Sequence, residues 1–418
     1  MIPFVLAAFL AQGNFEQRGF IENSTLFYPQ TAPNDSGHAV DEMLLRWEVS
    51  YKIAPWITFH GAIDAETDTH RQVERDWRFD ATDRSILRPA FSLRRYNATI
   101  HKGKFTAELG RQFIRWGKTD VLNPTDRFAP KDYLSNVIVP DFLGVIAARV
   151  TIEQGSNSYE AVWQPVFTPS RTPLLDQRWT VIPQQAAGIG IEDAGARYPG
   201  RSQFGARWNH IGAGYEWSVS YFDGFNYLPL FNAPYALSSP SIPATGGGIV
   251  SLPMPTFTLN LQRFYPELRE YGADAAVPLK WFTLKGEAAY FTSTTPDTDE
   301  YGLYVIQVER QVKEWSFVGG YAGEVLTRQG NPLQFAPDRG FARSFVGRAG
   351  WTIDPNRSLA VETAIRAAGS FTRLEYSQSY GQHWRATAGV AWVRGDMADF
   401  LGEYRRNSYA SLAVRYSF

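Results

Sequence analysis

The chain ends with the stretch Tyr409-Ala410-Ser411-Leu412-Ala413-Val414-Arg415-Tyr416-Ser417-Phe418, in which apolar residues alternate with small or polar ones. Because successive side chains of a β-strand point to opposite faces, Leu412, Val414, Tyr416 and Phe418 share one face. The ends of soluble domains usually fray, whereas this chain ends on the most hydrophobic residue of its last strand. The stretch therefore predicts a terminal strand that is held in place up to its final residue.

The composition predicts one continuous structural unit. The chain has 418 residues, more than one soluble core normally supports, yet no linker, low-complexity stretch or charge block divides it. It has no cysteine, which excludes disulfides and thiolate metal sites. Its 41 basic and 42 acidic residues are nearly balanced, which argues against a nucleic-acid partner.

The hydropathy pattern is typical of strands that meet lipid on one face only. No run of eighteen apolar residues occurs, so no transmembrane helix is expected. Apolar residues instead alternate with charged ones from about residue 42 onward, as in Leu45, Trp47 and Val49, which enclose Arg46 and Glu48. The same alternation is also compatible with a soluble β-sandwich. Aromatic residues make up 15% of the chain, and such side chains favour membrane interfaces.

The lengths of the connections favour a barrel over a sandwich. Tight turns such as 101–104, 154–157 and 354–357 alternate with longer, Pro- and Gly-rich links near 67–88, 116–142, 168–201, 224–266 and 328–341. Outer-membrane barrels have this alternation of short periplasmic turns and long outer loops. We therefore predict an all-β, antiparallel transmembrane barrel of about eighteen strands, the first over 15–27 and the last over 406–418, with both termini on the turn side. Sixteen strands is the alternative, because the first strand is weakly patterned.

The predicted domain organisation is simple. Residues 1–12 resemble the end of a secretory signal peptide without its positively charged start, although a buried first strand is an alternative. Residues 13–418 are expected to form a single outer-membrane barrel. Within it, the link 116–142 is a candidate for a loop folded into the lumen.

The stretch from residue 110 to 133 is the least strand-like part of the barrel and carries the candidate pore residues. It concentrates charge, aromatic residues and turn formers, including Asn123-Pro124 and Ala129-Pro130. A loop of this kind either contacts a solute at a constriction or is held rigidly to the wall by its own ion pairs, and the sequence leaves both open. The candidates are Arg111, Arg115, Trp116, Lys118, Asp120, Asp126, Arg127 and Asp132.

The same stretch carries a family resemblance. Gly110-Arg111-Gln112, Trp116-Gly117-Lys118-Thr119-Asp120 and the run 123–128 resemble segments of a poorly characterised family of porin-like Gram-negative outer-membrane proteins, distantly like the alginate-export channel. The ending, with Tyr416 and Phe418, resembles the signal that the barrel-assembly machinery recognises. The resemblance implies a β-barrel in the bacterial outer membrane, in contact with lipid and lipopolysaccharide. It does not specify a substrate.

Enzymatic functions have little support in the sequence. The histidines are dispersed, with no pair at metal-ligand spacing, and no Gly-x-Ser-x-Gly elbow or phosphate loop occurs. We predict no metal, no cofactor and no catalytic residue. A barrel hydrolase that assembles a Ser–His–acid site from separate strands remains an alternative.

The polar face of the strands predicts the lining of the lumen. The candidates are Arg46, Glu48, Arg149, Glu160, Arg207, Glu216, Lys285, Glu287, Glu362, Arg366 and Arg385. Neither sign of charge dominates, so we expect weak ion selectivity from the wall. The resulting hypothesis is a passive channel for small polar solutes that is narrowed by an inward-folded loop. The alternative is a plugged barrel that anchors a periplasmic or surface protein.

Overall fold

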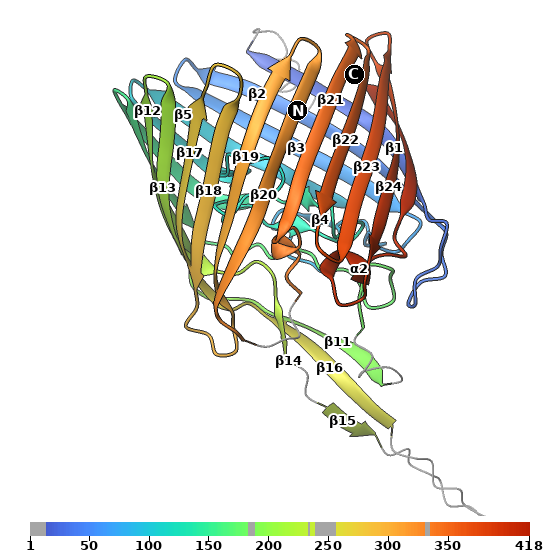
Figure 1. Cartoon of the computed structure of the whole chain (residues 1–418). Coiled ribbons are helices and arrows are strands. Elements are labelled where there is room, and N and C mark those ends of the chain that lie inside the picture. Colours follow the sequence, from blue (N-terminus) through green and yellow to red (C-terminus); the bar gives the residue numbers. More distant parts are fainter. Residues whose placement is uncertain (1–13, 183–188, 233–234, 239–255, 331–334) are drawn as a thin grey trace, which may run out of the picture.

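The protein forms a closed β-barrel (Figure 1). The computed structural model describes residues 14–182, 189–232, 235–238, 256–330 and 335–418. The predicted signal-peptide remnant at 1–12 lies outside the described residues. Eighteen strands make up the barrel, and each one pairs antiparallel with the next strand of the barrel.

The barrel strands follow one another around the wall in chain order. They are β1 (Phe15–Phe27), β2 (Ala39–Ala54), β3 (Ile57–Asp68), β5 (Phe91–Lys102), β6 (Phe105–Gln112), β9 (Val145–Gln154), β10 (Asn157–Gln164), β12 (Gln203–Gly212), β13 (Tyr215–Phe225), β17 (Glu267–Pro278), β18 (Thr283–Thr292), β19 (Glu300–Val312), β20 (Trp315–Arg328), β21 (Ser344–Asp354), β22 (Arg357–Ile365), β23 (Gly369–Tyr380), β24 (Trp384–Gly395) and β25 (Tyr409–Ser417).

The last strand closes the barrel against the first. β25 pairs antiparallel with β1 from Phe20↔Ser417 to Phe27↔Ala410. Beyond the strand, the backbone amides of Phe418 and Gly19 each donate to the carbonyl of the other at 2.9 Å. Gly19 is suited to this position, because a Cβ there would lie 2.6 Å from the Phe418 ring. Closure leaves no open sheet edge, as a strand structure in lipid requires.

The outer face of the wall is apolar. On β25, Leu412 and Val414 are exposed by 53% and 39%, while Ser411 and Ala413 point to the interior. Exposed aromatic residues gather at both ends of the strands. Trp56, Trp281, Trp315 and Trp384 lie at the turn end, and Trp163, Phe345 and Trp392 lie at the loop end. This apolar band between two aromatic girdles is the outer surface of a transmembrane barrel.

The two ends of the barrel differ as predicted. One end carries turns of two to four residues, the start of β1 and the end of β25, and the other carries the long connections (Figure 1). These long connections contain the remaining elements: β4 (Phe79–Asp80), β7 (Lys131–Asp132), β8 (Asp141–Phe142), β11 (Gly190–Arg197), β14 (Leu230–Asn232), β15 (Tyr235–Ser238), β16 (Thr256–Phe264), the 3₁₀ turn η2 (Pro337–Arg339) and α2 (Phe400–Glu403).

Some of the long connections form a second, small sheet. β11, β14 and β15 each pair with β16 in a small sheet that projects from the loop end (Figure 1). Among the described residues, no helix has both the length and the apolar character needed to cross a membrane.

The predicted strand number is confirmed, and the alternative of sixteen is wrong. The weakly patterned first strand spans Phe15–Phe27 as predicted and forms one side of the closing seam. The last strand begins at Tyr409 rather than at 406, because the residues before it belong to the connection that contains α2.

A charge on the lipid face should destabilise the barrel more than one on the lumen face. We expect Leu412→Lys to cost about 2–4 kcal/mol if it lies near the bilayer midplane, because the ammonium would be placed in hydrocarbon. Ala413→Lys, one residue along the same strand, should be tolerated. Heat-modifiable gel mobility after refolding into lipid, titrated with denaturant, measures the difference. Equal stabilities would contradict the assigned faces.

Candidate functional site

The candidate site is built around the connection 113–144, here called the inner segment. It leaves the wall after Gln112 of β6 and returns at Val145 of β9, and these two residues are themselves paired. Where β6 no longer pairs with the loop end of β5, the short strand β4 pairs with β5 instead. β4 runs parallel to β5 and pairs with Phe91 and Ser92. The chain can therefore turn away from the wall without leaving β5 unpaired.

Glu287 of β18 is the principal anchor of the inner segment. Its Oε2 accepts hydrogen bonds from the amides of Lys118 and Thr119 at 2.9 and 3.0 Å and from the Thr119 hydroxyl at 2.8 Å. Its Oε1 accepts from the amide and the hydroxyl of Thr125, both at 2.9 Å. The carboxylate is buried, and five donors compensate its desolvation.

Neighbouring strands hold the same part of the segment. The Lys118 ammonium lies 3.1 Å from carboxylates of both Glu216 on β13 and Asp274 on β17. The Asp120 amide donates to Gln307 Oε1 on β19 at 3.0 Å. These contacts fix residues 118–125 against inward-facing side chains of four consecutive strands.

An internal turn gives this part of the segment its shape. Asp126 Oδ1 accepts from the amides of Trp116 and Gly117 at 2.6 and 2.7 Å, and its Oδ2 accepts from Arg115 Nε at 3.0 Å. This carboxylate therefore ties the two ends of the stretch 117–126 together. Trp116 packs over Gly205 of β12, where a Cβ would lie 2.7 Å from the indole.

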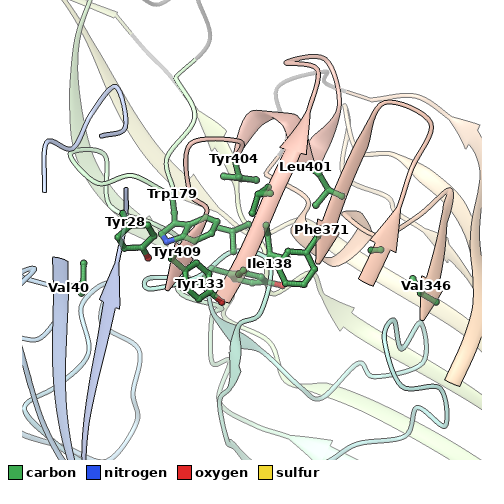
Figure 2. Packing of buried hydrophobic residues seen from close by; sticks show 14 of the residues in the cluster. Tyr28, Val40, Tyr133, Ile138, Trp179, Val346, Phe371, Leu401, Tyr404 and Tyr409 are labelled. Atoms are coloured by element: carbon green, nitrogen blue, oxygen red, sulfur yellow. The ribbon is translucent and has the colours of Figure 1, made fainter. Parts of the chain in front are cut away.

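The second half of the segment packs on the opposite wall. Tyr133 and Ile138 enter the aromatic cluster (Figure 2), whose other buried residues come from β2, β21, β22, β23, β24, β25 and four further long connections, with Leu26 of β1 packed against them. Its buried residues are Tyr28, Val40, Tyr133, Val137, Ile138, Trp179, Leu228, Val346, Ala364, Phe371, Ala391, Val393, Leu401, Tyr404 and Tyr409. Asn136 Nδ2 also donates to the Tyr409 hydroxyl at 3.2 Å. The segment is thus fixed at both ends to facing parts of the barrel.

Buried ion pairs connect the segment to other long connections. Asp132 accepts from Arg88 Nε at 2.8 Å and from Arg171 Nη1 at 3.0 Å. Asp83 pairs with Arg171 and also, at 2.5 Å, with Arg111. Three connections and the end of β6 are therefore joined in one charge network, in which each arginine satisfies a buried carboxylate.

A cavity of about 220 Å³ remains between the inner segment and the wall formed by β1, β2, β3 and β5. Inward-facing Glu22, Arg46, Asp64 and Glu66 line one side, and Asp141 and Phe142 of the segment line the other. Seven carboxylates and five guanidinium groups line it in all. They are Glu22, Glu42, Asp64, Glu66, Asp83, Asp132 and Asp141, with Arg46, Arg88, Arg94, Arg111 and Arg171.

The structure divides the predicted pore residues into two groups. Arg111, Trp116, Asp126 and Asp132 are buried, and of these Arg111 and Asp132 border the cavity. Of the remainder, Arg115, Lys118, Asp120 and Arg127 keep part of their surface accessible. Arg127 lies over the Phe291 ring, at 4.8 Å from its centroid.

Lys131 is a further cation of the inner segment. The Lys131 ammonium lies 5.5 Å from the centroid of the Phe142 ring, and burial lowers the pKa of this lysine.

The predicted lumen residues are also divided by the inner segment. Glu160, Arg207 and Glu287 are covered by it or by their own partners and are largely buried. The predicted residues Arg46, Glu48, Arg149, Glu216, Lys285, Glu362 and Arg385 keep more accessible surface.

Arg366 departs from its predicted place. It lies outside the wall strands, in the connection between β22 and β23. There it binds Asp399 at 2.7 Å and the carbonyls of Gly340 and Ala342, so that it braces the long connections.

Several residues of the site were not predicted. Glu66 and Gln307 could have been found by extending the two-residue alternation along β3 and β19. Asp83, Arg88 and Arg171 lie in long connections without periodicity, and no sequence signal indicates their partners.

The histidines give no catalytic arrangement among the described residues. His60 Nδ1 lies 2.9 Å from Ser50 Oγ, and His70 Nε2 lies 2.8 Å from Asp35. In the part of the chain that is described, no hydrogen-bonded series joins a serine, a histidine and a carboxylate. No group of His, Asp and Glu there has the arrangement of a metal site.

Comparison with known proteins identifies the fold. No family model and no curated protein matches the sequence. Among solved structures, OccAB4 of Acinetobacter baumannii is 11% identical, with a TM-score of 0.53, 98% of this chain covered and 99% of the other. A BenF-like porin from Pseudomonas fluorescens is 8% identical, with a TM-score of 0.54 and 97% of each chain covered.

A third solved structure agrees with these two. The outer membrane protein OpdK from Pseudomonas aeruginosa is 9% identical, with a TM-score of 0.54, 96% of this chain covered and 98% of the other. The chain therefore has a porin-like barrel fold. The likeness to the alginate-export channel stays a prediction.

Replacing Glu287 with glutamine should release the inner segment. The amide keeps the shape of the side chain, but its NH₂ group would face donors at one of the two oxygen positions, at a cost of about 1–3 kcal/mol for each unsatisfied buried group. We expect faster tryptic cleavage at Arg115, Lys118 or Arg127 in the folded barrel. Glu309→Gln is the matched control, because among the described residues Glu309 pairs with Lys285 alone, at 2.5 Å, and it is more accessible. Equal cleavage rates would show that Glu287 does not hold the segment.

Proposed function

We propose that this protein is an outer-membrane channel that passes small polar solutes by passive diffusion, and that the inner segment narrows its lumen. The observation that carries the proposal is the attachment of this segment to facing walls. Glu287 and neighbouring side chains bind the first half of the inner segment to the wall strands from β10 to β19. The aromatic cluster packs the second half against β21 to β25, β1 and β2. In this proposal, the cavity along β1, β2, β3 and β5 is part of the passage that the inner segment leaves open.

The lining of that space supports polar rather than apolar cargo. The cavity is bordered by seven carboxylates and five guanidinium groups, and apolar solutes would have to displace water from these charges without replacing its hydrogen bonds. Two of the structural neighbours are a BenF-like porin and the outer membrane protein OpdK. Their low identity supports the barrel fold alone, so the cargo is inferred from this chain's own side chains.

Within this mechanism, the predicted pore residues take two roles. Arg111, Trp116, Asp126 and Asp132 hold the inner segment in place, because they are buried in its internal and wall contacts. Arg115, Lys118, Asp120 and Arg127 have accessible surface and are the members that can meet a solute or its water shell.

A barrel that docks another protein is the second candidate. The small sheet of β11, β14, β15 and β16 projects from the loop end (Figure 1) and is not part of the wall. Such a projection favours a surface partner. A protein that copurifies stably with the barrel, together with the absence of conductance in bilayers, would favour this function over the channel.

Removing the tip of the inner segment should enlarge the pore. Asp126 Oδ1 binds the amides of Trp116 and Gly117, so residues 118–125 can be replaced by two glycines without separating the flanking chain. We expect higher single-channel conductance in planar bilayers and faster liposome swelling with small sugars. Glu287→Gln should change both in the same direction by a smaller amount.

The deletion variant must first show the heat-modifiable gel mobility of a folded barrel. If that variant is folded and its conductance and swelling rate equal those of the wild type, the inner segment does not limit passage and the constriction is lost from the proposal.

The channel should select weakly between small ions. Acids and bases of the lumen are interspersed and mostly paired, as in Arg46 with Asp64 at 2.7 Å and Lys285 with Glu309 at 2.5 Å, so no single-sign ring filters ions. We expect a small reversal potential in a KCl gradient across a planar bilayer. A potential close to the Nernst limit for either ion would contradict this.

A further inference from the structure

Three charged side chains of the cavity lack hydrogen bonds. Within the described residues, Glu66 of β3 and Asp141 of the inner segment form neither a side-chain hydrogen bond nor an ion pair, although both border the cavity. Arg94 of β5 donates no hydrogen bond there, and the carboxylate oxygen of Asp64 approaches it only to 3.7 Å. Among the described residues of the cavity lining, these three groups, here called the free groups, are therefore available for hydrogen bonds to a solute.

Each of the remaining charged side chains of the cavity is paired with an oppositely charged one. Arg46 makes two bonds to Asp64 at 2.7 and 2.8 Å, and Arg88 binds Glu42 and Asp132. Arg111 and Arg171 share Asp83, and Glu22 binds Arg415 at 2.7 Å. The three free groups are thus an exception in a lining that otherwise pairs its charges.

The Arg94 guanidinium is held in a defined position. It lies over the ring of Phe113, the first residue of the inner segment, at 4.9 Å from the ring centroid. This contact leaves the N–H groups on the edge of the guanidinium available for a carboxylate, which they can bind bidentately. Glu66 and Asp141 lie within electrostatic range of the same guanidinium but do not bind it.

We propose that this cavity is a binding site for small zwitterions that carry a carboxylate and an ammonium group, as α-amino acids do. Arg94 binds the carboxylate, and Glu66 and Asp141 accept hydrogen bonds from the ammonium. Each charged group of such a solute would therefore hydrogen-bond a side chain that forms no hydrogen bond within the described residues. A solute with a single charge satisfies only one end, and a neutral sugar satisfies neither. The inference deepens the proposed channel function and rests on it, because the cavity lies in the passage.

Tracer flux through proteoliposomes tests this site. The probes are L-alanine, N-acetyl-L-alanine, which lacks the ammonium, L-alaninamide, which lacks the carboxylate, and L-arabinose, which is uncharged. We expect L-alanine flux to saturate and arabinose flux to rise linearly with concentration. Each single-charge analogue should need about tenfold or more higher concentration to saturate, because one charged hydrogen-bonding partner is lost.

Two variants assign the ends of the solute to their partners. Arg94→Gln should raise the half-saturating concentration of L-alanine and N-acetyl-L-alanine but not that of L-alaninamide. Glu66→Gln should raise it for L-alanine and L-alaninamide but not for N-acetyl-L-alanine. Matched controls are Arg197→Gln on β11 and Glu314→Gln in the turn between β19 and β20, both exposed and away from the cavity.

The outcomes separate the site from the channel. If arabinose does not cross in the wild type, the channel function itself is wrong. If arabinose crosses but L-alanine flux does not saturate, or saturates at the same concentration as both analogues, the zwitterion site is wrong and the channel stands. If a variant fails to fold, the analogue series in the wild type still decides the matter.

Discussion

The need to pair every backbone amide and carbonyl inside a membrane governs this structure. A strand that faces lipid can meet this requirement only in a sheet without edges, and this chain meets it by joining its last strand to its first. The closing seam extends to the final residue, since the Phe418 and Gly19 backbones bond to each other in both directions. The terminal aromatic residue is therefore part of the wall, and its ring covers the glycine that faces it.

Closure with eighteen strands creates a second requirement, which concerns the interior. A barrel of this size encloses more space than side chains of the wall can fill. The inner segment occupies part of that space, and its two halves use different interactions. The half on β18 is held by buried hydrogen bonds to one carboxylate, whereas the half near β25 is held by packing in the aromatic cluster. Directional bonds fix its register, and apolar burial supplies non-directional stabilisation.

The sequence predicted the wall well and the interior only in part. Two-residue alternation is a local signal, so strands such as Phe15–Phe27 and the closing strand could be assigned from residues near in the chain. The inner segment stood out for the same reason, because Trp116, Asn123-Pro124 and Asp126 break that alternation. The partners of these residues could not be predicted. Glu287 meets Thr119 across 168 residues, and Arg171 meets Asp83 across 88, and no periodicity links such positions.

Charge pairing also indicates where the interior remains open. A buried charge without a partner is costly, so carboxylates and guanidinium groups at sealed contacts are paired, as Asp132, Asp83 and Glu287 are. Unpaired charges persist where water can reach them. Among the described residues that border the cavity, Glu66, Asp141 and Arg94 form no side-chain hydrogen bonds. A solute that enters the cavity beside β3 and β5 would meet these three groups, because the other charges of the cavity lining are paired.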